Sequence, residues 1–253
     1  MFKIEIITFV FCVLAALLHG LSGFGFPMIS TAALSMFYPL SVAVAMVIIP
    51  CLILNLMVLH SDPERSFLQT LHYYLQKYWI LILSSLIGSF MGVTLLLYLN
   101  ENYLKFMMGT VILLYVLDQL RAQPIRIQQS LHNMLIFGGL AGIIGGATNA
   151  MAPFLMMYLL STRHQKTDIV MISNLSFLAS KIIQLGMLYP TLYSFQSTQI
   201  YLLLAITLAA LGFVYLGSKI RAHLSQQKFK RIILTLLTLL GMNAIWQAVV
   251  HFQ

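Results

Sequence analysis

The sequence predicts an all-α integral membrane protein of about eight transmembrane helices. Two observations indicate this fold class. Hydrophobic residues make up 60% of the 253 residues and charged residues only 8%, whereas a soluble domain carries about 25% charged residues. Apolar runs of roughly the length that crosses a bilayer also follow one another along the whole chain. The connections between them are short, so we expect one membrane domain and no sizeable domain outside the bilayer.

Polar residues divide the chain into eight predicted spans. The first run continues past Leu18 without a small-x-small cleavage site, so we expect a retained span and not a cleaved signal peptide. The first and fifth spans are too long for one straight crossing, and each is interrupted by glycines and a proline, which predicts broken or re-entrant helices. The spans are residues 5–38, 41–60, 78–99, 103–119, 133–160, 168–188, 198–217 and 232–250.

The two over-long spans resemble one another. Gly20-Leu-Ser-Gly23 and Gly139-Leu-Ala-Gly142 share a pattern of small residues 119 positions apart, close to half the chain. The span that follows each one carries an amide, Asn55 in the first case and Asn174 in the second. This layout predicts a duplication into two four-helix repeats, which would cover residues 1–126 and 127–253.

Lys and Arg residues predict the orientation, provided that every span crosses once. Cytoplasmic loops are enriched in these residues. One set of loops holds eight and the other five, so both termini are predicted to lie outside the cytoplasm; a re-entrant first or fifth segment would change which loops share a side. The eight are Lys105, Arg163, Lys166, Lys219, Arg221, Lys228, Lys230 and Arg231, and the five are Lys3, Arg65, Lys77, Arg121 and Arg126.

Lys181 is the only formal charge well inside a hydrophobic stretch, residues 168–190. It lies about 20 Å along its predicted helix, past the midpoint of a core about 30 Å thick. A charge at this depth is costly and normally serves a function. Lys181 therefore predicts an anion site, with Gln184 at i+3 and Asn174 at i−7 as neighbours on the same face. The alternative is a lysine whose ammonium extends to the headgroups.

The breaks in the first and fifth spans are predicted at residues 22–27 and 145–153. Discontinuous helices place half-helix N-termini and unpaired backbone groups at mid-membrane, where they attract anions. The alternative is that the small residues only allow helices to pack closely. The candidate anion-binding groups at the breaks are Ser22, Gly23, Gly25, Thr148 and Asn149.

Acidic residues are few and lie in loops or near span ends, so no buried carboxylate is expected to oppose an anion or hold Na⁺. Moving one negative charge out of a cell with a negative interior gains about 2.3 kcal/mol per 100 mV, so export needs no coupling ion. Uptake would need one. His19, directly before the first break, is the candidate proton carrier, against a histidine that only packs and forms hydrogen bonds.

These segments resemble the TauE/SafE sulfite exporter family, also called TSUP transporters. The residues similar to its first signature are Gly20-Leu-Ser-Gly-Phe-Gly-Phe26, and those similar to its second are Gly138-Gly-Leu-Ala-Gly142, Gly145-Gly146, Pro153, Ser173-Asn174 and Ser180-Lys181. The chain departs from the family at Ala32, where a proline is frequent, and at Ala150 and Ala152, where glycines are. The resemblance implies a multi-pass transporter of sulfite, an organosulfonate or another small anion in a bacterial inner membrane.

Other function classes have weaker support. The net charge of +8 is spread over loops without interleaved aromatic residues, so no nucleic acid is expected. The seven histidines show no metal-ligand spacing, and no catalytic constellation is present, so we expect neither a metal nor an enzyme. A cofactor on Lys181, such as retinal, would lack a buried carboxylate as counter-ion. The expected partners are a small anionic substrate and the lipid bilayer, and a homo-oligomer is compatible with the sequence.

Overall fold

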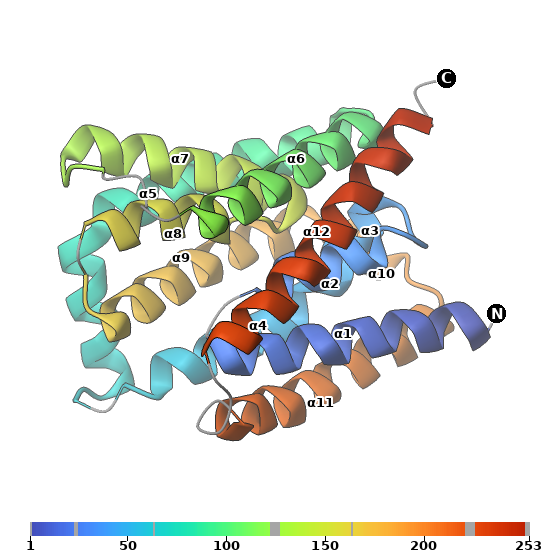
Figure 1. Ribbon diagram of the computed structural model, residues 1–253, viewed down its shortest axis with the longest axis horizontal. Helices are drawn as coiled ribbons and strands as arrows, with labels where there is room; N and C mark the ends of the chain where they lie inside the picture. The colour runs from blue at the N-terminus through green and yellow to red at the C-terminus, as the bar shows by residue number, and fades with distance from the viewer. Residues whose placement is uncertain are drawn as a thin grey trace.

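The computed structural model describes residues 2–22, 25–62, 64–121, 127–162, 164–220 and 226–250, and these residues form helices and no strand (Figure 1). The predicted all-α class is confirmed. The helices are α1 (Phe2–Ser22), α2 (Phe26–Leu34), α3 (Leu40–Met46), α4 (Ile48–His60), α5 (Phe67–Tyr98), α6 (Glu101–Leu120), α7 (Leu131–Thr148), α8 (Ala152–Ser161), α9 (Lys166–Met187), α10 (Tyr189–Tyr193), α11 (Ser197–Ile220) and α12 (Gln226–Val250).

Six helical stretches in the described part of the chain are long and apolar enough to cross a membrane. They are Leu40–His60, Phe67–Tyr98, Glu101–Leu120, Leu131–Thr148, Thr167–Met187 and Ser197–Gly217. α5 begins eleven residues before the predicted span 78–99, and its backbone leaves helical geometry at Tyr78 (φ −123°, ψ 21°). The hydrophobic run therefore marked only the part of α5 beyond this kink. The chain is a multi-pass membrane protein.

The first over-long span is a helical hairpin, in which α2 turns back along α1 (Figure 1). At the tip, the Phe26 backbone N–H donates to Nδ1 of His19 at 3.4 Å. At the open end, Tyr38 lies near Glu5. Gly25 at the tip has φ 110°, a conformation that residues with a Cβ rarely adopt. The span is thus re-entrant and does not continue along one axis.

The fifth span is a second hairpin, formed by α7 and α8. The rings of Phe137 on α7 and Tyr158 on α8 stack with centroids 5.9 Å apart, well away from the tip. Asn149 ends α7 in the left-handed conformation with φ 62°, which Asn adopts more readily than most residues. α2 and α8, the two returning arms, both carry a proline in their first turn, Pro27 and Pro153, where the missing N–H costs no helix bond.

Each hairpin returns to the end of the molecule where it began, so the assumption of a single crossing was wrong for the first and fifth spans. The ends of α4, α6, α8 and α11 then lie towards one end of the molecule, while α1 begins and α12 ends at the other (Figure 1). By their place in the chain, eleven Lys and Arg residues belong to the first of these ends. Lys3 and Lys105 belong to the second, and Lys181 belongs to neither.

α5 and α7 pack against each other through glycines. A Cβ on Gly92 would lie 2.1 Å from the carbonyl oxygen of Ile143, and one on Gly146 would lie 2.4 Å from that of Ser89. Both distances are far below van der Waals contact. Small residues at such contacts let helices in a membrane approach closely, and here they bring α7 against the segment of α5 beyond its kink.

The same kind of contact joins α1 to α11. A Cβ on Gly20 would lie 2.1 Å from the carbonyl oxygen of Val214, and one on Gly217 would lie 2.4 Å from that of Leu17. For Gly20 and Gly146, close packing is therefore the observed role. A Cβ on Gly139, in contrast, would have no atom within 4 Å. The match of Gly20 with Gly139 was wrong, because the two glycines occupy different environments.

Candidate functional site

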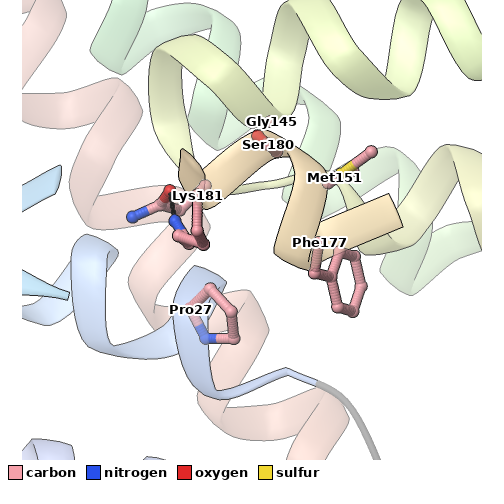
Figure 2. A pocket seen from close by; sticks show the side chains of 7 residues that line it. Pro27, Gly145, Met151, Phe177, Ser180 and Lys181 are labelled. Atoms are coloured by element: carbon pink, nitrogen blue, oxygen red, sulfur yellow. Dashed lines mark hydrogen bonds between the residues drawn. The ribbon is translucent and has the colours of Figure 1, made fainter. Parts of the chain in front are cut away.

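Lys181 lies in α9 with 3% of its surface exposed. Its ammonium donates hydrogen bonds to Oδ1 of Asn149 and, at 2.5 Å, to Oε1 of Gln184. Asn149 stands at the tip of the α7–α8 hairpin, so the charge lies where that hairpin ends inside the protein (Figure 2). The alternative of a lysine that extends to the headgroups was wrong, because the ammonium is held by buried amides.

Gln184 fixes the hairpin tip to α9. Its Nε2 donates to the carbonyl oxygens of Gly145 at 3.2 Å and Gly146 at 3.0 Å, and to Oδ1 of Asn149 at 2.9 Å. The last carbonyls of a helix have few partners within the helix. Gln184 supplies a donor to the carbonyl of Gly146 and shares the carbonyl of Gly145 with the backbone N–H of Asn149. The predicted neighbourhood of Lys181 and Gln184 agrees with these bonds.

Asn149 also connects the two hairpins. Its Nδ2 donates to Oγ1 of Thr31 on α2 at 2.7 Å, while its backbone N–H bonds to the carbonyl of Gly145 at 2.8 Å. A single amide thus touches Lys181, the end of α7 and the returning arm of the first hairpin. Sequence reasoning did not identify Thr31, because an isolated threonine in an apolar run carries no distinctive signal.

A small cavity lies beside the ammonium, between the two hairpin tips. Figure 2 shows Lys181 and Pro27 on facing elements, with Met151 and Phe177 on the other side of the cavity. The volume of this cavity is about 10 Å³, which is room for about one water molecule. A larger ligand therefore requires the tips to separate. The lining residues are Pro27, Gly145, Asn149, Met151, Phe177, Ser180 and Lys181.

The other predicted groups are not brought to the ammonium. Thr148 uses its hydroxyl within the turn, donating to the carbonyl of Ile144 at 2.7 Å and accepting from the Ala150 N–H at 3.4 Å. Asn174 is buried in α9 and donates to its own helix, to the carbonyl of Val170 at 2.8 Å.

The predicted groups of the first break lie at the tip of the α1–α2 hairpin. Gly25 precedes α2 and its carbonyl accepts from the Ile29 N–H at 3.0 Å. Ser22 is the last residue of α1, but its side chain, like the whole of Gly23, lies outside the described residues. The residue that the structure brings to the cavity from this hairpin is Pro27.

The charge on Lys181 has neutral partners. Within the described residues, the ion pairs lie near the ends of the helices, as between Arg65 and Asp62 at 3.6 Å and between Lys105 and Glu101 at 3.1 Å. The ammonium of Lys181 instead bonds to two amide oxygens. A buried charge without a counter-charge is costly, and an anion in the cavity would offset that cost.

His19 belongs to the other hairpin and is 2% exposed. Its Nδ1 accepts the N–H of Phe26, while its Nε2 has no hydrogen-bond partner in the described structure. An unprotonated Nδ1 accepts this bond, so the neutral ring carries its proton on Nε2. His19 does not line the cavity beside Lys181.

A family model described as Sulfite exporter TauE/SafE matches residues 8–244. Searches of curated proteins and of solved structures gave no match. The matched range contains the tips of both hairpins, Lys181 and each of the side chains that bond to it.

Proposed function

Because this chain belongs to the sulfite exporter TauE/SafE family, we propose that it carries a small anion, sulfite or an organosulfonate, out of the cell past Lys181. The family is one of membrane transporters, which favours transport over catalysis. The observation that carries the proposal is the buried ammonium, held by neutral amides at the meeting point of two re-entrant hairpins. Such an arrangement binds a negative charge and releases it when the hairpins move.

The ammonium has the hydrogen-bonding capacity for a substrate oxygen. A lysine has three N–H donors, and two of them are directed at Asn149 and Gln184, which leaves one for the anion. Hydrogen bonds between an ammonium and an anionic oxygen are about twice as strong as neutral ones. Sulfite and sulfonates present several such oxygens, and the hairpin tips would separate to admit one.

The charge distribution supports an orientation. Eleven Lys and Arg residues at one end against two at the other favour the first end as cytoplasmic, and this places both termini outside the cytoplasm, as the sequence predicted. We also propose that this membrane is a bacterial inner membrane. Export of one negative charge gains about 2.3 kcal/mol per 100 mV, so the potential alone suffices to drive it.

The two hairpins support a duplication into halves 1–126 and 127–253, and hence eight membrane segments. The two halves correspond with an offset of 126 residues, which we call the register. The last residues of α1 and α7 are 126 positions apart, and the same offset separates the first residues of α2 and α8 and those of α3 and α9. The glycine contacts agree, because Gly20 against α11 corresponds to Gly146 against α5. α1 and α7 start from opposite ends of the molecule, so the halves would be inverted repeats of the kind that builds many transporters.

The test is transport in liposomes. The purified protein would be reconstituted and the flux of sulfite, thiosulfate, sulfate, sulfoacetate and chloride measured under an imposed membrane potential. Saturable flux of a sulfur oxyanion is the expected result. Saturable flux of a different organic anion would support the assignment as a transporter but change the substrate class. If protein-free liposomes pass every anion as fast, the proposal fails.

Gln184→Leu should lower the maximal rate about tenfold and the free energy of unfolding by about 1–3 kcal/mol, because it removes the side-chain donor to the carbonyls of Gly145 and Gly146. Flux assays and thermal melting in detergent measure the two effects. The control is Gln199→Leu, which removes an amide that accepts only from the Gln196 N–H at the start of α11. Equal rates and melting temperatures for Gln184→Leu and wild type would contradict the assigned role.

His19→Gln should leave the pH dependence of transport unchanged. The glutamine amide oxygen can accept the N–H of Phe26 as Nδ1 of His19 does, so the cap of α2 is kept while the titratable ring is lost. Flux measured from pH 5 to pH 8 in both proteins tests this expectation. A pH profile that flattens in the variant would instead identify His19 as a proton carrier and favour coupled transport.

A further inference from the structure

Asn55 on α4 occupies the position in the first half that Lys181 occupies in the second. The register of 126 residues that relates α3 to α9 at their first residues pairs Asn55 with Lys181. α3 and α4 together form one continuous apolar stretch, Leu40–His60, with the length of α9. The register is therefore kept from the start of this stretch to Asn55.

His19 stands in the first half where Gly145 stands in the second, by the same register. A Cβ on Gly145 would lie 2.6 Å from Cβ of Met151, so the side chain of Met151 fills the space that Gly145 leaves. In the first half the sizes are exchanged, because the large residue is His19 and the counterpart of Met151 is Gly25. Since Met151 lines the cavity beside Lys181, the His19 ring is expected beside Asn55.

Both side chains have a buried nitrogen without a partner. Asn55 is 1% exposed, and its Nδ2 forms no hydrogen bond in the described structure. The same holds for Nε2 of His19, the nitrogen that carries the proton when Nδ1 accepts the N–H of Phe26. Leaving a buried donor unpaired costs about 1–3 kcal/mol. The two donors stand at the positions that correspond to Lys181 and Gly145 in the second half. Together they indicate a ligand with acceptor oxygens.

The counterpart position is close to Lys181. α4 and α9 pack against each other and run in opposite directions between the two ends of the molecule. Cys51 on α4 lies near Lys181, and Asn55 lies one turn further along α4, about 6 Å along the axis. An anion could therefore move between the two positions without leaving the space between the hairpins.

We propose that Asn55 and His19 form a second, uncharged binding station for the transported anion, donating from Nδ2 and Nε2 to its oxygens. This inference rests on the proposed function. The two stations would lie on opposite sides of the axis that relates the two halves. Lys181 neutralises the charge of the anion at one station, and the N–H donors alone hold it at the other, so the anion is bound less tightly there and can leave.

The test is Asn55→Leu, which keeps the volume and removes the donor. Its KM for the transported anion should rise about tenfold, as expected for the loss of a hydrogen bond to a charged group, and its maximal rate should stay within about twofold. Without anion, its melting temperature should equal or exceed that of wild type, because the removed amide had an unpaired donor. Asn55→Gln, which keeps an N–H donor, should retain most of the affinity.

Ser89→Ala serves as the matched control. Like Asn55→Leu, it removes a buried polar group without a partner in the described structure, here the hydroxyl of Ser89 where α5 packs against α7. It should not change the KM. Suppose that the wild-type protein transports the anion and Lys181→Met does not. An unchanged KM in Asn55→Leu would then overturn the second station and leave the proposed function standing. A lower melting temperature in Asn55→Leu with an equally raised KM in Asn55→Gln assigns a packing role and also overturns it. Without saturable flux in wild type, the station falls together with the proposed function.

Discussion

Replacing Lys181 by methionine should reduce saturable anion flux at least about a hundredfold, because it removes the one charge buried at the site. Loss of a charge-assisted contact to an ionic substrate typically costs several kcal/mol. The fold should survive, since an apolar side chain of similar volume in place of a buried charge is often neutral or stabilising. Flux in liposomes and thermal melting of the purified protein measure the two outcomes separately.

Lys105→Met is the matched control for this prediction. Lys105 is also buried, at 6% exposure, but it pairs with Glu101 in the first turn of α6 and lies outside the cavity. Its replacement should leave the flux within about twofold of wild type, because a single ion pair near a helix end contributes little. Wild-type flux in Lys181→Met would refute the site, and equal loss in both variants would indicate a general effect of removing positive charge.

Replacing Gly92 by valine should remove most of the folded protein from the membrane. Even the first added carbon would lie 2.1 Å from the carbonyl oxygen of Ile143 and 2.9 Å from the N–H nitrogen of Ala147. Both are backbone atoms, so relief requires α5 and α7 to move apart along their whole contact. Overpacking costs about 1–3 kcal/mol where side chains can adjust, and more where they cannot. Yield after detergent extraction and monodispersity in size-exclusion chromatography measure the effect.

Gly139→Ala provides the comparison on the same helix pair. A Cβ at Gly139 would have no atom within 4 Å, and alanine favours helix over glycine by about 1 kcal/mol. We expect wild-type yield and an equal or higher melting temperature. Normal yield of Gly92→Val, or an equal loss in Gly139→Ala, would show that the close contact between α5 and α7 does not limit stability.

The sequence predicted the helices well and the path of the chain between them poorly. Apolar runs about the length of a bilayer crossing mark spans because the membrane demands them, and the glycines and proline after His19 correctly marked an interruption. The composition of a tip does not reveal whether the chain continues or returns. That outcome depends on contacts distant in sequence, such as Phe137 with Tyr158. For this reason the sequence groups some of the loops differently from the structure.

The candidate site was predictable where one helix sets the spacing. Lys181 and Gln184 share a face at i+3, and Asn149 stood at a predicted break, so these three were found and the structure joins them. Thr31 was not found, because its bond to Asn149 crosses between hairpins 118 residues apart. Asn174 was predicted because it lies at i−7 on the face of Lys181, but its side chain donates to the carbonyl of Val170 within α9.

The two hairpins differ in how they meet the helix that follows each of them. α9 packs against both arms of the second hairpin, whereas α4 packs less closely against α1 and α2 in the described residues. In a protein built from two inverted halves, the halves can exchange their conformations. The result is the same structure turned over in the membrane, so that it faces the opposite side. Alternating access would then need no separate design, since each half already contains the conformation that the other must adopt.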